Sequence, residues 1–276
     1  MSDFIGTKLT MNLGERSYDI ILKNGALENL YQFARLDRKV AVVTDSGVPA
    51  EYAQRVADQC RESTIITVPQ GEASKSFKIL ETVLRQMLEF NMGRGDLVVA
   101  VGGGVVGDLA GFAAATYMRG IDFINCPTTT LSMIDSSIGG KTAVDLGDTK
   151  NIVGAFWQPK LVIVDLATLS TLPRRHYING LAEAVKAGLL ADPELFAIFE
   201  KGDIDTQISE IIYRSLRFKK NVVEQDETER GMRKALNFGH TIGHGIEAVK
   251  GIKGRRTVGL FHGECVALGM LPMIES

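Results

Sequence analysis

The stretch "DLVVAVGGGVVGDLAGFAAATYMRG", residues 96–120, decides the fold class of this 276-residue chain. It begins with an apolar run that predicts a buried β-strand, and three consecutive glycines follow. The small residues after the glycines predict a closely packed helix. A strand, a glycine turn and a helix in this order are typical of α/β domains with a parallel sheet. Asp108 and the many glycines make the stretch a poor membrane span.

The sequence on both sides of this unit alternates in the same way. Short apolar runs predict further strands within residues 16–25, 39–48, 63–72, 122–130 and 160–169. Helical periodicity predicts helices within residues 50–60 and 76–90. The alternation indicates βαβ units, with helices on both faces of a parallel sheet.

The pattern changes after Leu172 and Pro173. From there onward the sequence shows helical periodicity and no convincing strand, and residues 205–225 predict a long amphipathic helix. We therefore predict an α/β N-terminal domain over residues 1–172 and an all-α C-terminal domain over residues 173–276. A ligand cleft between the two domains is expected.

The composition excludes several classes of function. The net charge is −2, with 31 Lys and Arg against 33 Asp and Glu, so no dedicated nucleic-acid or membrane surface is expected. The three cysteines are widely spaced, which disfavours a disulfide framework or a cysteine zinc site and favours a reducing cytosol. The N-terminus lacks the pattern of a signal peptide. We expect a cytoplasmic protein.

The glycine turn is a candidate nucleotide site. Residues 102–107 match G-x-G-x-x-G between a predicted strand and a predicted helix, where glycines let a pyrophosphate approach the backbone. Asp45, at the end of an earlier strand, is placed like a carboxylate that binds ribose hydroxyls, although a turn aspartate is the plain alternative. The match alone is weak, and it lies later in the chain than the usual dinucleotide fingerprint.

Residues 127–151 are dense in Thr, Ser, Gly, Lys and Asp. The "GGKT" within them resembles the end of a P-loop, but Asp135 stands where that motif needs glycine, so a P-loop NTPase is disfavoured. We interpret the segment as a loop whose Lys141, Lys150 and Asn151 bind a phosphorylated or carboxylated small molecule. The alternative is a solvated surface loop.

Histidines provide the candidate metal site. His240 and His244 are four residues apart and would share a helix face, and His262 follows within 23 positions of His240. Thr241 stands where the metalloprotease motif has its glutamate, so a protease is disfavoured. Glu183 is a candidate carboxylate ligand. The pattern favours a divalent metal, but spacing leaves open which three groups bind it.

Two neighbours of these residues carry further expectations. Glu183 and Lys186 are three residues apart, so a carboxylate and an ammonium should share one helix face. His176, at the predicted domain junction, is expected to be exposed.

Four segments together resemble the 3-dehydroquinate synthase family of the shikimate pathway. They are "PTTTLSMIDSSIGGKTAVD" (127–145), "GLAEAVK" (180–186), "DETERGMRKALNFGHTIGHGIE" (226–247) and "FHGECVALGM" (261–270). The resemblance runs from about Asp45 to the C-terminus. It implies a Rossmann-like N-terminal domain and a helical C-terminal domain, with NAD and a divalent metal, Zn²⁺ or Co²⁺, between them.

The resemblance also implies roles for individual residues. The metal ligands would be Glu183, His240 and His262, and His244 would be a non-ligand that handles protons. The NAD contacts would be Asp45, Glu72, Lys75, Gly104, Val105, Val106, Asp108, Thr128, Thr129 and Lys150. The substrate contacts would be Asp135, Lys141, Asn151, Lys186, Lys219, Arg233 and Asn237. Of these, Lys141, Asn151, Lys186 and Arg233 would also act in catalysis. Arg119 would reach the phosphate site of a neighbouring subunit, which implies a homodimer.

The implied substrate is 3-deoxy-D-arabino-heptulosonate 7-phosphate, whose carboxylate and phosphate suit the cationic side chains. The reaction would be a transient oxidation by NAD, β-elimination of phosphate, reduction, and aldol closure to 3-dehydroquinate, so that NAD is not consumed. The metal would act as a Lewis acid and template on the substrate hydroxyls.

One departure from the family concerns length. The family continues with further helices, including a late lysine that resembles a substrate ligand, so we expect either a fragment or a shortened C-terminal domain. Extra residues between His244 and His262 predict a surface loop. Three rival functions remain open: a metal-dependent polyol or alcohol dehydrogenase of the same architecture, another sugar-phosphate cyclase, and a non-catalytic NAD-binding fragment. A dehydrogenase should lack "DSSIGGKT" and the cationic set, and another cyclase should differ at Arg233, Asn237 or His244.

Overall fold

The computed structural model describes residues 4–249 and 259–274. Seven strands form the main sheet in the order β1-β2-β9-β6-β5-β3-β4, and all neighbours except β1 and β2 run parallel. Their bounds are β1 Thr7–Met11, β2 Tyr18–Leu22, β3 Lys39–Asp45, β4 Glu62–Val68, β5 Leu97–Gly102, β6 Asp122–Pro127 and β9 Leu161–Val164. The predicted parallel sheet is confirmed.

Helices cover both faces of this sheet because its central strands are apolar on both sides. Along β3, Ala41 and Val43 pack in one cluster with α2 (Phe77–Glu89) and α3 (Gly104–Thr116). Val40 and Val42 point the other way and pack with α1 (Ala50–Ala57). Side chains alternate along a strand, so a continuous apolar run is what a doubly covered strand requires.

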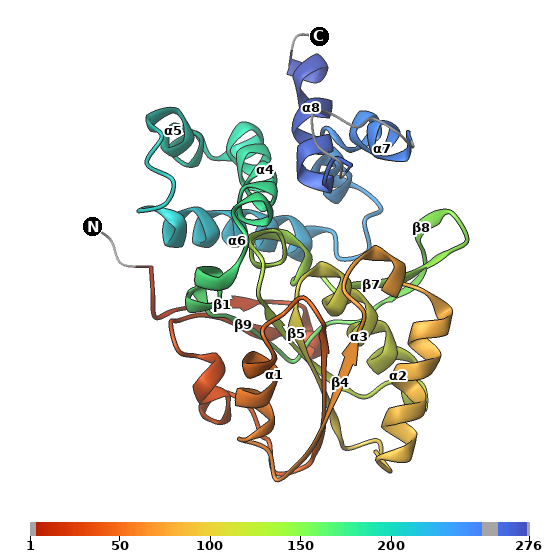
Figure 1. The fold of residues 1–276 in the computed structure, drawn as a ribbon. Coiled ribbons are helices and arrows are strands. Elements are labelled where there is room, and N and C mark those ends of the chain that lie inside the picture. The colour runs from red at the N-terminus through yellow and green to blue at the C-terminus, as the bar shows by residue number, and fades with distance from the viewer. Residues whose placement is uncertain (1–3, 250–258, 275–276) are drawn as a thin grey trace.

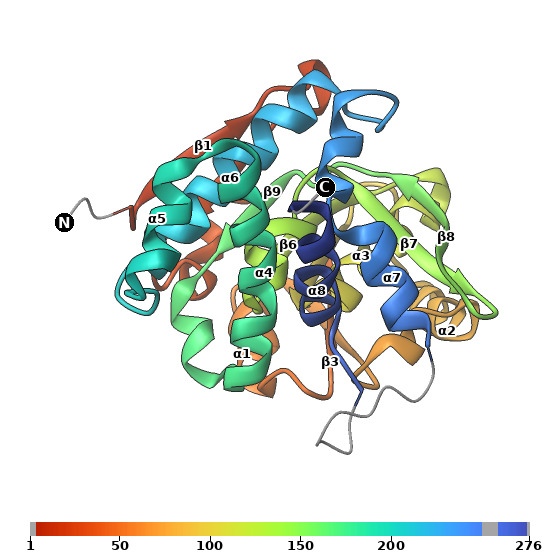
Figure 2. The ribbon, with the colours of Figure 1, turned by 90° about the horizontal axis from the view of Figure 1, so that it is seen from above.

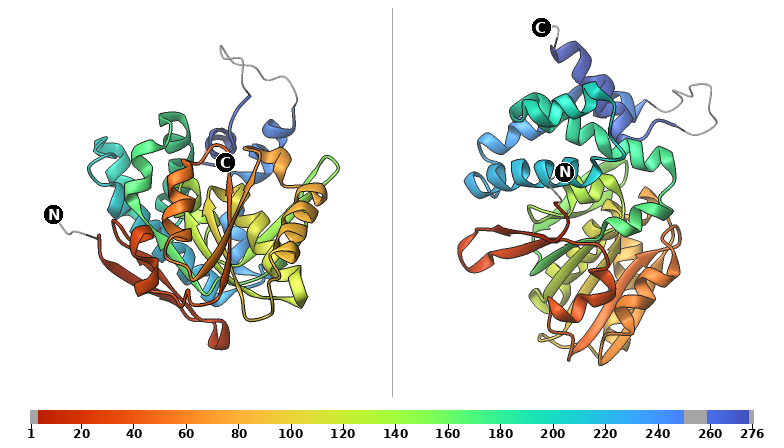
Figure 3. Two further views of the ribbon diagram at one scale, coloured as in Figure 1. Left: turned by 60° about the horizontal axis from the view of Figure 1, so that its bottom comes forward. Right: turned by 90° about the vertical axis from the view of Figure 1, so that its left-hand side faces the viewer.

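The C-terminal part is helical, and Figure 1 shows it above the sheet. Its helices are α4 Arg174–Ala191, α5 Pro193–Lys201, α6 Ile208–Gln225, α7 His240–Ala248 and α8 His262–Ile274. Leu181, Ile212 and Leu216 pack against Ile20 and Val162 of the sheet in one buried cluster. Seen from above, α8 lies between α4 and α7 (Figure 2), and two further views show the same two-part arrangement (Figure 3).

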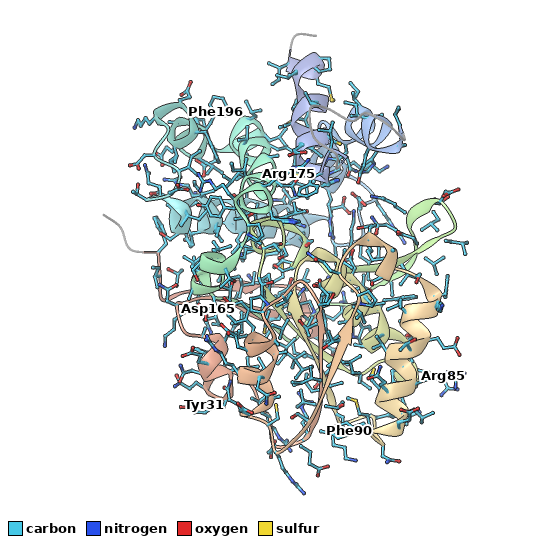
Figure 4. All side chains as sticks on the ribbon, in the orientation of Figure 1. Tyr31, Arg85, Phe90, Asp165, Arg175 and Phe196 are labelled. Carbon is cyan, nitrogen blue, oxygen red and sulfur yellow. The ribbon has the colours of Figure 1, made fainter. Side chains whose placement is uncertain are left out.

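The junction between the two parts follows β9. Asp165, labelled in Figure 4, accepts hydrogen bonds from the backbone N–H groups of Gly25, Leu27 and Ala167 at 3.0–3.1 Å. It caps the 3₁₀ segment Leu166–Thr171 that leads to Pro173 and α4. The predicted strand over 160–169 is therefore half strand and half 3₁₀ helix.

The interpretation of residues 127–151 as a loop was wrong. The segment holds a π-helix, Ser132–Ser136, and much of a two-stranded antiparallel sheet made of β7 (Lys141–Leu146) and β8 (Thr149–Phe156). The sheet packs on α3, where Thr142 fills the space beside Gly111. Strand β1 was also missed.

The predicted loop between His244 and His262 lies largely outside the described residues. Within the described part, no helix combines the length and apolarity that a membrane crossing requires.

Candidate active site

A cavity of about 790 Å³ lies between the sheet and the C-terminal helices. Its lower wall is at the carboxyl ends of the central strands, with Asp45 as the last residue of β3, Gly103 after β5 and Thr128 after β6. β3 and β5 are neighbours in the sheet, but β4 follows β3 on one side and β6 follows β5 on the other. The crevice at such a change of direction is where open α/β sheets bind ligands. His244 and His262 belong to the opposite wall.

The glycine turn forms part of this cavity. Gly104 begins α3, so the unpaired N–H groups of a 13-residue helix start at the cavity wall. A Cβ on Gly102 would lie 2.6 Å from Val106, so the turn can be this tight only with glycine there. Val106 itself is wholly buried in the core and does not line the cavity, whereas Val105 does.

Asp45 both makes a turn contact and lines the cavity. Its Oδ1 accepts a hydrogen bond from the Gly47 N–H at 2.7 Å, which is a turn contact, and the residue also lines the cavity. The other predicted cofactor residues on the cavity wall are Glu72, Lys75, Gly104, Asp108, Thr128, Thr129 and Lys150.

Lys75 is the central cation of the lower wall. It is only 4% exposed, and its Nζ lies 2.7 Å from Asp108 Oδ2 and contacts Asn151 Oδ1. Asn151 has a positive φ of 56° and donates its N–H to Asp145 at 2.8 Å. The β7–β8 hairpin therefore contributes Lys150 and Asn151 to the lining of the cavity.

Three ligand candidates meet beside the cavity. Glu183 Oε1 lies 3.6 Å from His240 Nε2 and 3.8 Å from His262 Nε2, and all three ligand atoms lie within 4.8 Å of one another. Glu183 is 3% exposed, and its Oε1 has no hydrogen-bond partner. A buried carboxylate oxygen without a donor is costly unless a cation meets it. The set therefore fits a divalent ion held by one carboxylate and two imidazoles.

Both histidines turn the same nitrogen toward Glu183. His240 Nδ1 lies 3.3 Å from the Phe238 carbonyl oxygen, which suits a proton on Nδ1 and leaves Nε2 free. Burial lowers the pKa of His240 to about 4, so its ring is neutral at pH 7, as a metal ligand must be. Burial alone would lower the pKa of His262 as well, but Glu247 and Glu183 outweigh it and raise that pKa.

Glycines bring the two histidine helices together. A Cβ on Gly243 of α7 would lie 3.0 Å from the Cys265 carbonyl oxygen of α8, and one on Gly239 would lie 2.6 Å from Met270 Cγ. Gly263 donates its N–H to Asn179 Oδ1 of α4 at 2.8 Å. Since His240 and His262 are the first residues of their helices, this close packing sets the separation of their rings, with centroids 5.2 Å apart.

A second group of potential ligands shares one histidine with the first. His244, Glu247 and His262 also place ligand atoms within 4.8 Å of one another. His244 is exposed, and its ring centroid lies 5.4 Å from that of His240. The orphaned Oε1 of Glu183 favours the first group, because the Glu247 oxygens already face Lys150 and His262.

Most predicted substrate contacts lie behind the cavity wall and face partners within the protein. Lys219 Nζ lies 2.8 Å from Asp135 Oδ1, and Asp135 lines the cavity. Burial alone would raise the pKa of Asp135, but Lys219 and Lys186 hold it below its usual range. Lys186 Nζ contacts Glu183 Oε2 and donates to the Leu236 carbonyl at 2.6 Å.

The remaining predicted contacts do not line the cavity either. Arg233 is 1% exposed, and its Nη2 donates to the Gly139 carbonyl at 3.0 Å. Lys141 Nζ lies 2.5 Å from Glu229 Oε2, and Asn237 donates to Glu229 at 3.1 Å. Arg119 is exposed and does not line the cavity described here.

The structure corrects one expectation and adds residues that the sequence reasoning missed. His176 is partly buried, stacks on Phe261 with centroids 4.7 Å apart, and lines the cavity. Arg175, labelled in Figure 4, pairs with Glu264 at 2.7 Å and thereby joins α4 to the start of α8. Glu247 was missed although it lies three residues after His244, a spacing that puts both on one face of α7.

Comparison with known families accounts for most of the chain. Residues 65–179 match the family described as 3-dehydroquinate synthase N-terminal, and residues 180–275 match 3-dehydroquinate synthase C-terminal. The 3-dehydroquinate synthase of Pelobacter propionicus is 45% identical over 276 residues, covering 95% of this chain and 76% of that protein. That of Caulobacter vibrioides is 45% identical, covering 94% and 73%.

Solved structures agree with this grouping. A 2-deoxy-scyllo-inosose synthase, crystallised with carbaglucose-6-phosphate, NAD⁺ and Co²⁺, matches with a TM-score of 0.86 at 29% identity, covering 96% of this chain and 75% of that one. The 2-epi-5-epi-valiolone synthase of Streptomyces hygroscopicus, with NAD⁺ and Zn²⁺ bound, gives 0.82 at 29%, covering 94% and 74%. A probable glycerol dehydrogenase from Sinorhizobium meliloti, at 18% identity, shares the fold. By sequence and architecture, the chain belongs to the 3-dehydroquinate synthase family.

Proposed function

We propose that the chain converts 3-deoxy-D-arabino-heptulosonate 7-phosphate to 3-dehydroquinate and phosphate, with NAD and a divalent metal, preferably zinc, in the cavity. The observation that carries the proposal is the unpaired, buried Oε1 of Glu183, which faces the Nε2 atoms of His240 and His262 beside the cavity. Relatives that are 41–45% identical over most of the chain carry the same name.

The two bound groups would supply reversible hydride transfer and Lewis acidity at the oxidised hydroxyl. Glu183, His240 and His262 would hold the metal. The lower wall would hold NAD through the N-terminus of α3 and through Asp45, Glu72, Lys75, Asp108, Thr128, Thr129 and Lys150.

The substrate's two anionic ends call for cations. Lys186 and Lys219 are buried next to Glu183 and Asp135, so they would lie beneath a substrate that sits over the metal set. Lys141, Asn151, Arg233 and Asn237 are the further predicted contacts. Lys141 and Asn237 now share Glu229 as partner, and an incoming phosphate or carboxylate would compete with that carboxylate for them.

His244 is the proposed proton acceptor at the cavity wall. Although His244 is exposed as a whole, partial desolvation of its ring lowers its pKa, and the nearby His262 lowers it further, so its imidazole is neutral at pH 7 and has a free nitrogen lone pair. Its ring lies 5.4–5.8 Å from the rings of His240 and His262, close to the metal set without belonging to it.

We also propose a homodimer, in which the exposed Arg119 serves the partner's phosphate site, and a cytoplasmic location. The three cysteines are unpaired thiols, two of them buried, which suits a reducing compartment.

Phosphate release tests the proposal. The protein, loaded with zinc or cobalt and NAD, should release inorganic phosphate from 3-deoxy-D-arabino-heptulosonate 7-phosphate without net formation of NADH. Glu183→Ala should abolish release, and Glu81→Ala, which removes only an exposed pair with Arg85 on α2, should leave it unchanged. If the loaded wild-type protein releases no phosphate, or if NADH accumulates in proportion to product, the proposed reaction is wrong.

A further inference from the structure

Glu247 joins the two halves of the cavity. It lies on α7, and its Oε1 lies 2.6 Å from Nζ of Lys150, which belongs to β8 of the α/β domain. Its Oε2 lies 3.5 Å from Nδ1 of His262, the first residue of α8. The side chain is partly buried, at 18% exposure. One carboxylate thus connects a lysine of the lower wall with a candidate metal ligand of the opposite wall.

The ring of His262 has a carboxylate on each side. Its Nδ1 faces Glu247, and its Nε2 lies 3.8 Å from Oε1 of Glu183. Histidines that bind metals usually donate the proton of their other nitrogen to a carboxylate or a carbonyl, which fixes the tautomer and the ring orientation. His240 has such a partner in the Phe238 carbonyl, and Glu247 Oε2, at 3.5 Å from Nδ1, takes the corresponding place beside His262.

We propose that Glu247 is a positioning residue, which orients the His262 ring toward the metal and is itself held in place by Lys150. The inference rests on the proposed function, because it presupposes a metal at Glu183, His240 and His262. It goes beyond that function by assigning a role to a residue outside the ligand set. It also makes the hairpin that carries Lys150 a support of the metal site.

The geometry argues against Glu247 as a ligand in its own right. A ligand carboxylate needs an oxygen free to meet the ion, and both oxygens of Glu247 already face a cation or a ring nitrogen. Glu183 Oε1, in contrast, has no hydrogen-bond partner.

Metal affinity, measured without turnover, tests the inference. Zn²⁺ affinity is determined by competition with a chromogenic chelator, and Co²⁺ binding by its visible absorption, for wild type, Glu247→Ala, Glu247→Gln and Lys150→Met. Glu247→Ala should bind 10- to 100-fold more weakly, in line with the loss of partners behind metal ligands. Glu247→Gln keeps an acceptor for Nδ1 and should recover most of that loss. Lys150→Met should stay within about threefold of wild type, a smaller loss than that of Glu247→Ala.

Other results would overturn the inference. Glu247→Ala within twofold of wild type would show that the carboxylate does not position His262. Equal losses of metal affinity in Lys150→Met and Glu247→Ala would show that Glu247 acts only through its contact with Lys150, between α7 and β8. A stoichiometry of two ions that falls to one in Glu247→Gln would make it a ligand. If Glu247→Ala does not fold, Glu247→Met, which also removes the acceptor for Nδ1 but fills the space of the side chain, replaces it in these comparisons, with Glu81→Ala as the matched control for loss of a glutamate charge.

The experiment separates this inference from the proposed function. If wild type binds no metal, both are overturned. If wild type binds one ion and releases phosphate while the affinity of Glu247→Ala is unchanged, only the positioning role is overturned.

Discussion

Lys186 forms a buried ion pair with Glu183 one turn away on α4, and the side chains of the pair are 4% and 2% exposed. The ammonium meets Oε2, while Oε1 faces the two histidines. One oxygen of Glu183 is therefore paired with a lysine of the protein, and the other faces the place where a metal fits. Burial raises the pKa of Glu183, although Lys186 counteracts this effect.

Lys186→Met should destabilise the metal-free protein by about 3–5 kcal/mol, since it leaves a buried carboxylate without its cation. The loss should be smaller with zinc bound, because the ion then compensates the same charge. Urea unfolding in the presence of a chelator and in the presence of zinc measures both values. Equal losses under the two conditions would show that the metal does not sit at Glu183.

The two histidines of α7 should respond differently to mutation. His240→Ala should remove the bound metal, as should His262→Ala on α8. His244→Ala should keep one bound ion and lower kcat by about 10²–10⁴-fold, the usual contribution of a general acid or base. Metal content and rate are measured on the same preparations. If His244→Ala loses the metal as completely as His262→Ala, then His244 is a ligand.

Gly139 tests the packing around Arg233. Its φ is +92°, and a Cβ there would lie 2.5 Å from Nη2 of Arg233. Gly139→Ala should lower the free energy of unfolding by more than the strain of a left-handed residue alone, which is about 1–2 kcal/mol. It should also weaken substrate binding. Gly147→Ala is the control, because Gly147 has a φ of +61° with open space around it. Similar urea midpoints and KM values for the two variants would contradict a role for this contact.

The segment before Arg233 predicts a pH dependence. Asp226 accepts hydrogen bonds from the N–H groups of Arg230, Gly231 and Arg233 at 2.7–3.0 Å, and these, that of Arg230 most of all, lower its pKa. A carboxylate whose pKa is lower in the folded state stabilises that state above its unfolded pKa of about 3.9. This contribution is lost as the pH falls through the folded value.

Asp226→Asn should therefore be less stable than wild type at pH 7, and the difference should shrink below about pH 4. Urea midpoints of both proteins between pH 3 and pH 7 provide the comparison. A difference that stays constant down to pH 3 would show that the charge of Asp226 is not what stabilises the turn.

The sequence predicted the central sheet well, because strands such as β3 and β5 are buried on both faces and read as continuous apolar runs. It failed for β8, whose residues Thr149–Ile152 are all exposed, so no apolar alternation marks the strand. Strand β1 is an edge strand of five residues with one buried side chain, and its pattern was equally weak.

For the site, residue spacing alone found the histidines but could not choose among them. The three proposed ligands come from α4, α7 and α8, and only the packing of these helices shows that Nε2 of His262 points to Glu183 while Nδ1 points to Glu247. Likewise, no sequence pattern reveals that Lys150 crosses the cavity to α7. Such contacts depend on tertiary structure over about 100 residues of chain.

The glycine contacts between α7 and α8 have a consequence for mutational scanning of this chain. Gly239, Gly243 and Gly269 lie where α7 and α8 meet, and even a methyl group at any of them would clash with backbone or a packed side chain of the other helix. Alanine at these positions would separate the two histidines and abolish growth in a complementation screen as completely as loss of a ligand. A scan scored by survival alone would therefore assign these glycines to the chemistry, although their task is to keep two helices at contact distance.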